Sequence, residues 1–243
     1  MAEMNNSGLQ PRSVDAGRGI SWWTEGWALF MKNAGIWIVI ALILVVASVV
    51  LNFIPFIGSL ALTLLTPVVT GSLLLAARKT ESGGALDVAD IGLGFKESLN
   101  PLLVLGALLL GASVVIVVVM SVLGFGAIMG MGVSGASHSM AGMMAAAGFG
   151  LIALLVGLAL FVPVAMAMWF SPALVVFHGV PPVEAARASF TACLRNIVPF
   201  LLHGIVFFVA AIIASIPFGL GWLALLPVVM LTMYISYRDV FGS

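Results

Sequence analysis

The sequence is poor in charged residues and in cysteine. Asp, Glu, Lys and Arg make up only 7% of its residues, against roughly 25% in ordinary globular domains. A soluble domain needs a polar surface, and so few charges cannot cover one. Cys193 is the single cysteine, which excludes an internal disulfide and any metal site built from several cysteines. The formal net charge is zero, so we expect no nucleic-acid partner.

What the chain has instead is long apolar runs. Apolar residues make up 63% of it, and the mean hydropathy is +1.26. A helix needs about 20 apolar residues to cross the hydrocarbon core of a bilayer. Six windows come close to this length or exceed it: residues 34–54, 57–77, 101–123, 148–176, 197–215 and 220–237. The sequence therefore predicts an all-α integral membrane protein with about six transmembrane helices. Pro163 and Pro172 predict a kink or a broken end in the fourth.

The charged residues predict the orientation of these spans. All nine Lys and Arg residues lie before the first span, between the second and third, between the fourth and fifth, or after the sixth. The alternate connections, residues 52–56, 124–147 and 216–219, contain neither. Because cytoplasmic loops are the ones enriched in Lys and Arg, we expect both termini in the cytoplasm. Residues 1–19 form a polar cytoplasmic segment without the apolar core of a cleaved signal peptide.

The chain also contains an internal threefold repeat. Each pair of spans follows a short charged stretch in which three residues take positions i, i+3 and i+7 on one helical face. These residues are Trp23, Gly26 and Phe30; Val88, Ile91 and Phe95; and Val183, Ala186 and Phe190. A proline follows inside the second span of each pair: Pro67, Pro163 and Pro227. The pattern predicts three units, each with a cytoplasmic interfacial amphipathic helix before a hairpin of two spans.

The repeat units cover residues 20–80, 86–178 and 182–240 of a single membrane domain, residues 20–240. All three have the same orientation, so they are parallel repeats related by an axis along the membrane normal. The turns Ile54-Pro55-Phe56 and Ile216-Pro217-Phe218 match between the first and third units. The aligned prolines leave two interpretations open: ordinary bends, or three kinked helices around a central cavity. The absence of charge inside the spans favours ordinary bends.

This layout resembles a group of bacterial multipass inner-membrane proteins that share a domain of unknown function. Members open with a Trp-rich interfacial stretch, here Gly19-Ile20-Ser21-Trp22-Trp23-Thr24-Glu25-Gly26-Trp27-Ala28-Leu29-Phe30. More loosely, the chain is similar to the membrane domain attached to some glycerophosphodiester phosphodiesterases. The likeness covers most of residues 14–240 and implies a bacterial inner-membrane location. No catalytic phosphodiesterase segment is present, so that activity does not carry over.

Methionine is concentrated in residues 124–147, which we expect to form a Gly- and Met-rich outer loop. His138 lies among five methionines: Met129, Met131, Met140, Met143 and Met144. Thioether sulfur is a soft ligand suited to Cu(I), and histidine would complete such a site. The alternative is that methionine is apolar filler here and the segment a flexible linker. Handling of Cu(I) by this segment is therefore the minor functional alternative.

His203 and three asparagines are the other polar residues of note. His203 is the one titratable residue deep in a span, and a proton relay would need an acidic partner that the spans do not offer. We expect it instead to form a hydrogen bond with a hydroxyl or a backbone carbonyl. Asn33, Asn100 and Asn196 recur just before the first span of each unit. We expect them to cap those helices.

No set of residues matches a catalytic signature or a cofactor motif. The sequence therefore predicts a protein that is not an enzyme and needs no cofactor. We expect an accessory or scaffold protein of the inner membrane whose partners are membrane lipids or another membrane protein complex. The alternative is a transporter or channel for a small solute or lipid through the pseudo-threefold bundle. A transport path for a polar solute would bring several polar side chains together at the bilayer midplane.

Overall fold

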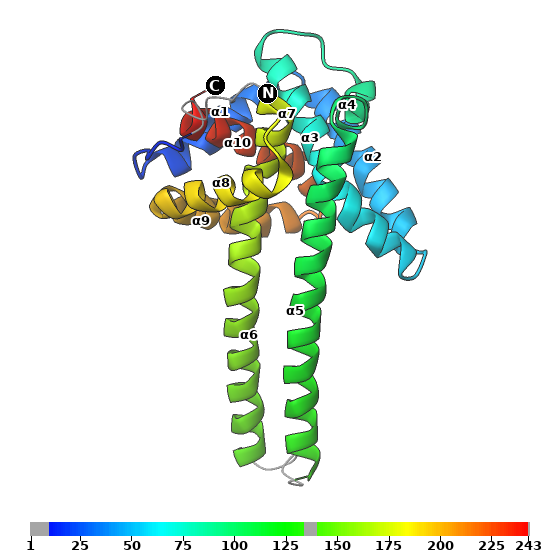
Figure 1. Cartoon of the computed structure of the whole chain (residues 1–243), viewed down its shortest axis with the longest axis vertical. Helices are drawn as coiled ribbons and strands as arrows, with labels where there is room; N and C mark the ends of the chain where they lie inside the picture. The colour runs from blue at the N-terminus through cyan, green and yellow to red at the C-terminus, as the bar shows by residue number, and fades with distance from the viewer. Residues whose placement is uncertain (1–9, 134–139, 243) are drawn as a thin grey trace, which may run out of the picture. The chain divides into compact units, whose positions relative to one another are not determined.

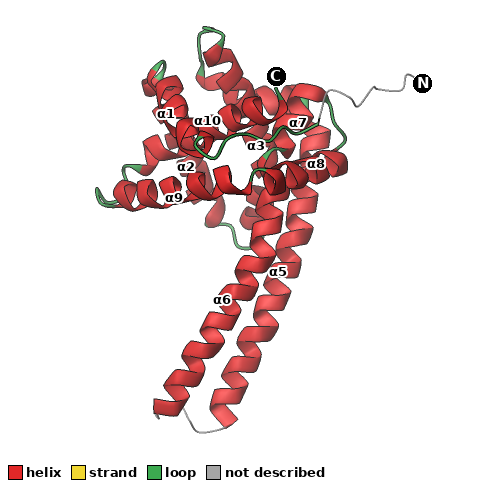
Figure 2. Cartoon of the chain, turned by 90° about the vertical axis from the view of Figure 1, so that its left-hand side faces the viewer, coloured by secondary structure: helices red, strands yellow, loops and turns green. Residues whose placement is uncertain are grey.

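Helices make up almost all of the described part of the chain (Figures 1 and 2). The computed structural model describes residues 10–133 and 140–242, and no β-strand occurs within these ranges. The helices are α1 (Arg18–Met31), α2 (Ala34–Asn52), α3 (Ile57–Glu81), η2 (Val88–Gly92), α4 (Leu93–Glu97), α5 (Leu99–Val133), α6 (Met140–Trp169), α7 (Ser171–His178), α8 (Pro182–Arg195), α9 (Ile197–Ser215) and α10 (Trp222–Phe241).

Six helical segments of the described residues are long and apolar enough to cross a membrane. They are Ala34–Asn52, Ile57–Glu81, Leu99–Phe125, Ala146–His178, Ile197–Ser215 and Trp222–Phe241. Each overlaps one of the six predicted windows, so the expected all-α multipass class is confirmed. Burial differs among them: 61% of the best window in α10 is buried and 50% of that in α3, against 17% in α2. Helices α3 and α10 are therefore packed against other helices over half or more of these windows, whereas most side chains of α2 are exposed.

The chain divides into two compact units. The first comprises residues 1–107 and 166–243, and the second comprises residues 108–165. The second unit consists of parts of α5 and α6, which run side by side in both views (Figures 1 and 2). Gly157 of α6 lies opposite Met120 of α5, because a Cβ at Gly157 would stand 3.6 Å from the Met120 sulfur. Valine and leucine side chains of this unit are exposed, as expected for helices surrounded by lipid.

The segment expected as an outer loop is largely helical. Helix α5 continues to Val133, and α6 already begins at Met140. The prediction of a loop over residues 124–147 is therefore wrong for all but residues 134–139, which lie outside the described part. Alanine and methionine are good helix formers, and glycine is frequent in transmembrane helices. Composition alone therefore does not distinguish such a helix from a linker.

The predicted broken end of the fourth span is present. Helix α6 ends at Trp169, and α7 begins at Ser171 with Pro172 in its first turn, where the missing N–H is tolerated. The Ser189 hydroxyl of α8 accepts a hydrogen bond from the Phe170 N–H at 2.9 Å and donates one to the Met166 carbonyl at 2.6 Å. The backbone groups released by the break are thus paired from a neighbouring helix. Pro163 lies inside α6 and does not end it.

Short amphipathic helices precede the first spans, and glycine brings two of them close to a span. Helix α1 packs on α10 and α9, η2 and α4 pack on α3, and α8 packs on α7. The Gly94 N–H donates a hydrogen bond of 2.8 Å to the Ser72 hydroxyl of α3. A Cβ at Gly94 would lie 2.5 Å from the Val68 carbonyl oxygen, so any larger residue would push α4 away from α3.

The turns Ile54-Pro55-Phe56 and Ile216-Pro217-Phe218 share an uncommon backbone conformation. Phe56 has φ 62° and Phe218 has φ 53°, values that residues other than glycine seldom adopt. Both side chains are almost fully exposed. The proline before each phenylalanine restricts the backbone of both turns.

Candidate functional site

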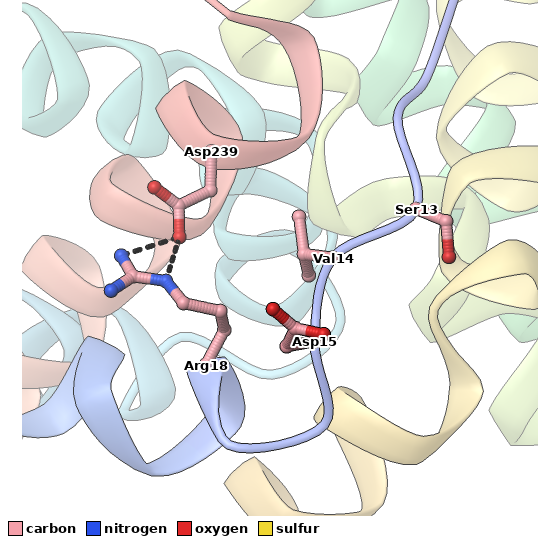
Figure 3. A pocket seen from close by; sticks show the side chains of 5 residues that line it. All are labelled: Ser13, Val14, Asp15, Arg18 and Asp239. Carbon is pink, nitrogen blue, oxygen red and sulfur yellow. Dashed lines mark hydrogen bonds and ion pairs between the residues drawn. The ribbon is translucent and has the colours of Figure 1, made fainter.

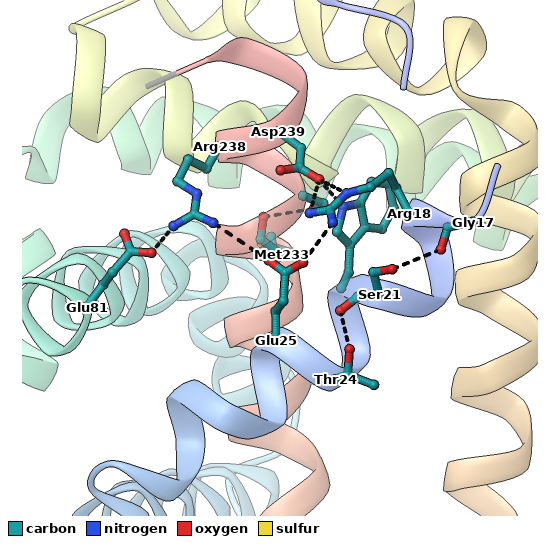
Figure 4. Close-up of polar contacts among 11 residues, drawn as sticks. Gly17, Arg18, Ser21, Thr24, Glu25, Glu81, Met233, Arg238 and Asp239 are labelled. Carbon is teal, nitrogen blue, oxygen red and sulfur yellow. Dashed lines mark hydrogen bonds and ion pairs between the residues drawn. The ribbon is translucent and has the colours of Figure 1, made fainter. Parts of the chain in front are cut away.

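Charged side chains of α1, α3 and α10 form one network (Figure 4). Arg18 donates hydrogen bonds to Asp239 at 2.6 Å and to Glu25 at 2.8 Å. Arg238 forms ion pairs with Glu25 at 3.6 Å and with Glu81. The hydrogen bond to Glu25 raises the pKa of the Arg18 guanidinium and the bond to Asp239 contributes in the same direction, while burial opposes both. The network holds three helices together.

Aromatic side chains extend this network into the protein. Trp22 donates its Nε1–H to Asp239 at 2.8 Å, and the Tyr234 hydroxyl donates to Glu81 at 2.7 Å. Each of these carboxylates therefore accepts from both an arginine and an aromatic residue. Such carboxylates are engaged structurally, and none is positioned as a free general base.

A small hollow lies beside the network (Figure 3). It has a volume of about 380 Å³, and it is lined by Ser13, Val14, Asp15, Arg18 and Asp239. The guanidinium in its wall is already paired with Asp239. An incoming anion would have to displace that carboxylate, so the hollow does not have the character of an anion site.

Hydrogen bonds from Asn196 hold residues 12–14 against the rest of the first unit. Its Oδ1 accepts from the Val14 N–H at 2.8 Å, and its Nδ2 donates to the Arg12 carbonyl at 2.9 Å. Arg12 in turn donates its backbone N–H to the Val240 carbonyl at 2.8 Å. Residues 12–14 are thereby tied to the ends of α8 and α10.

The predicted capping role of the three asparagines is wrong. Asn33 and Asn196 stand at the N-cap positions of α2 and α9, but neither side chain makes a capping hydrogen bond. Asn100 lies inside α5, which begins at Leu99. For α9 two reasons are visible: the Asn196 Oδ1 accepts from the Val14 N–H instead, and the third helical residue, Pro199, has no N–H to donate.

His203 lies in a cluster of aromatic rings. It is 4% exposed, it stacks on Trp23 at a centroid distance of 5.0 Å, and Trp169 meets it edge-on at 5.3 Å. Its backbone carbonyl accepts from the Trp23 Nε1–H at 3.2 Å, whereas its Nδ1 has no hydrogen-bond partner among residues 10–133 and 140–242. The expected hydrogen bond to a hydroxyl or a backbone carbonyl is therefore not made by Nδ1. Aromatic packing holds the imidazole instead.

A large apolar cavity opens along α2. Its volume is about 670 Å³, within the range of roughly 300–1,000 Å³ that is typical of small-molecule sites. Helices α2 and α3 form most of its walls, η2, α4 and α10 complete them, and all of these residues belong to the first unit. The lining side chains are Trp37, Ile40, Ala41, Ile43, Leu44, Val45, Ala47, Ser48, Val49, Leu51, Asn52, Leu62, Leu65, Thr66, Val69, Thr70, Leu73, Ile91, Phe95, Leu226, Pro227 and Met230.

The polar side chains of this cavity are few, and most are already bonded. Ser48 donates to the Leu44 carbonyl and Thr66 to the Leu62 carbonyl, each at 2.7 Å. Trp37 differs, because its Nε1–H is buried and has no hydrogen-bond partner in the described structure. An unpaired buried donor is costly, which makes Trp37 the polar feature of the cavity that remains to be explained.

Comparison with known proteins finds a relative of similar length. The chain is similar to a protein of Burkholderia thailandensis named as a probable inner membrane protein, with 29% identity over 260 aligned residues that cover 96% of this chain and 94% of the relative. No family model matches the chain, and no solved structure matches it. The likeness and the six apolar helices support a multipass protein of the bacterial inner membrane.

The Cu(I) prediction involves residues that the structure describes only in part. His138 lies outside the described residues. Met129, Met131 and Met143 belong to helices α5 and α6, but their side chains are not described, whereas Met140 and Met144 are exposed on the first turns of α6. In the described ranges, no group of three or more His, Cys, Asp or Glu residues is placed to hold a metal ion. The Cu(I) site stays a prediction.

Sequence reasoning missed both the cavity and the network. Trp37 was the available signal for the cavity, since it is the one tryptophan inside the predicted first span. The network had no comparable signal. Arg18 and Asp239 lie at opposite ends of the chain, and only the packing of α1 on α10 brings them together.

Proposed function

We propose that this protein is a non-enzymatic accessory or scaffold protein of the inner membrane, which binds another membrane protein complex or membrane lipid. The observation that carries the proposal is that the polar side chains are bonded within the protein. Charged residues of α1, α3, η2 and α10 pair with one another, and hydroxyl groups inside the spans bond to their own helices. These internal bonds hold the helices in fixed positions, which suits a protein that binds partners at its surface.

The hydroxyl groups bear most directly on the transport alternative. Ser48, Thr63, Thr66, Ser113 and Ser215 each donate to the carbonyl four residues earlier in the same helix. A path for a polar solute instead needs polar groups that converge between helices. The interior of the first unit is filled by large side chains such as Trp22, Phe170, Leu174 and Leu231. Both observations favour a packed protein over a conduit.

We further propose that the six spans form three parallel hairpin repeats, with both termini in the cytoplasm. Each interfacial helix packs on the second span of the preceding unit, in cyclic order: α1 on α10, η2 and α4 on α3, and α8 on α7. The glycine contacts of α1 and α4 also fall at matching positions, one and five residues after Pro227 and after Pro67. Three interfacial helices held in this way would present a cytoplasmic platform.

The resemblance to the membrane domain of glycerophosphodiester phosphodiesterases agrees with this role. A membrane domain attached to a separate catalytic domain serves as an anchor or a binding module.

Purification in native nanodiscs, followed by mass spectrometry, tests the proposal. We expect another membrane protein to co-purify in fixed stoichiometry and to be lost when Arg18 and Arg238 are both replaced by alanine. The Arg187→Ala variant, which changes an exposed charge of α8, serves as the control. A chain that purifies alone and carries solute flux in liposomes would contradict the accessory role and favour the transporter.

A further inference from the structure

We propose that the cavity between α2, α3 and α10 binds a glycerophospholipid, with one acyl chain lying along α2 and an ester carbonyl accepting the Trp37 Nε1–H. The inference rests on the proposed role as a protein that binds membrane components, and it names the component. The site belongs wholly to the first unit.

The dimensions of the cavity suit one acyl chain. Its lining runs along α2 from Trp37 to Asn52, a length of about 22 Å at 1.5 Å per residue. Half of the hydrocarbon core measures about 15 Å, so the cavity covers the full depth of one leaflet. With a volume of about 670 Å³, it is much larger than the gaps left by imperfect side-chain packing.

The chemistry of the walls selects an apolar occupant. Leucine, isoleucine, valine and alanine dominate the lining. The hydroxyl groups of Ser48 and Thr66 already donate hydrogen bonds to the backbone carbonyls of Leu44 and Leu62 in their own helices. Asn52 donates its amide to the Ser48 carbonyl at 2.8 Å. A polar solute bound here would give up its hydrogen bonds to water and gain few from the walls, which is unfavourable. An alkyl chain has no such hydrogen bonds to give up.

Trp37 specifies where the polar part of the lipid lies. Its side chain is fully buried, and its Nε1–H makes no hydrogen bond within the described ranges. It stands in the first turn of α2, where an indole at the membrane interface is level with the glycerol and ester groups of lipids. Because Nε1 has almost no accessible surface, the indole must turn about its side-chain bonds to present it to the cavity. An ester carbonyl, which is an acceptor without a proton of its own, would then pair this donor.

Two exposed lysines flank the same end of the cavity. Lys32 ends α1 just before α2 begins, and Lys96 directly follows the lining residue Phe95. Both side chains are exposed, and neither forms an ion pair with another described residue. Lysine attracts the phosphate of a lipid headgroup. With the predicted orientation, the bound lipid comes from the cytoplasmic leaflet.

The test compares two tryptophan substitutions on adjacent residues of α2. Ala47 lines the cavity, while Val46 is not among the lining residues and is half exposed. Each variant is purified in mild detergent, washed extensively, and analysed by native mass spectrometry and by lipid extraction. We expect about one phospholipid per chain in the wild type and in Val46→Trp, and at least a tenfold loss in Ala47→Trp.

A third variant tests the role of the indole. Trp37→Phe keeps an aromatic ring and removes the donor, so retention should fall by about three- to tenfold, the effect of one hydrogen bond. The far-ultraviolet circular dichroism of all variants should match that of the wild type. Binding of a phosphatidylglycerol probe to delipidated protein in nanodiscs should rank the variants in the same order.

Three outcomes would overturn the inference. Equal lipid retention in Ala47→Trp and Val46→Trp would place any bound lipid elsewhere. Retention of an isoprenoid lipid without ester groups would exclude the Trp37 contact. Occupation of the cavity by a helix of a co-purified protein would exclude a bound lipid. A chain that purifies alone, carries solute flux in liposomes and still retains its phospholipid would instead contradict the accessory role and leave the lipid site standing.

Discussion

Single glycine and serine residues decide how closely the short helices α1, α4 and α8 approach the longer helices. Gly26 of α1 faces Thr232 of α10, where an added Cβ would stand 3.0 Å from the threonine methyl group. Gly94 makes the corresponding approach to Ser72 of α3. Where α8 meets the break at Phe170, Ser189 supplies the hydrogen bonds directly. These residues are small, and they control the distance between helices because a backbone or side chain of the neighbouring helix lies directly opposite each of them.

Gly94→Ala should destabilise the protein. The new Cβ would overlap the Val68 carbonyl and the Ser72 hydroxyl, and forced repacking of this kind costs about 1–3 kcal/mol. Unfolding in increasing proportions of SDS measures the change. Gly92→Ala is the matched control, because an added Cβ there meets nothing within 4 Å. Equal stability of the two variants would contradict the close approach of α4 to α3.

Cys193 should resist alkylation in the folded protein. Burial raises the pKa of its thiol to about 12, and only the thiolate is reactive. At pH 8 almost none is ionised, so N-ethylmaleimide should leave Cys193 unmodified until SDS unfolds the chain. Thr191→Cys provides an exposed thiol on the same helix and should react at once. Fast modification of Cys193 in the native protein would show that α8 is not packed as described.

At the scale of elements, the position of α1 depends on charge as well as on apolar packing. Its aromatic face meets α9 and α10, where Trp22 packs near Phe200 at 5.4 Å, while Arg18 and Glu25 pair with residues of α10. An amphipathic helix without such ion pairs would be free to rotate in the membrane interface. The ion pairs therefore set its rotation and its register on α10.

Arg18→Ala should loosen α1 and lower stability by about 1 kcal/mol, the range of partly exposed ion pairs. The loss should shrink in high salt, because salt screens the pairs of the wild type. SDS unfolding at low and high ionic strength measures both effects. The control is Arg187→Ala, whose side chain is exposed and forms no ion pair with any described residue. Identical salt dependence in the two variants would contradict the proposed role of the network.

For the whole molecule, the distribution of charge predicts the topology. Arg18, Glu25, Glu81, Arg238 and Asp239 meet in one network, as they must if both termini lie on the same side of the membrane. The turns at Phe56 and Phe218 carry no charge and expose apolar rings. Such turns cross a bilayer during insertion more readily than charged ones.

Reporter fusions should confirm this topology. Alkaline phosphatase is active only outside the cytoplasm, so fusions at Phe56 and Phe218 should be active and a fusion after Gly242 inactive. Green fluorescent protein at the C-terminus should be fluorescent. An active phosphatase at the C-terminus would reverse the predicted orientation, and would move the proposed lipid site to the outer leaflet.

The sequence by itself determined the membrane class, the six spans and the broken end near Pro172. These features are local: a span is recognised from its own hydropathy, and a proline interrupts the helix in which it stands. Only the tertiary structure decided that Asn196 holds residues 12–14, that His203 lies among tryptophans, and that Trp37 opens onto a cavity. Each of these depends on helices distant in the chain, and in an apolar sequence many alternative packings bury similar residues. Contacts, rather than hydropathy, select among them.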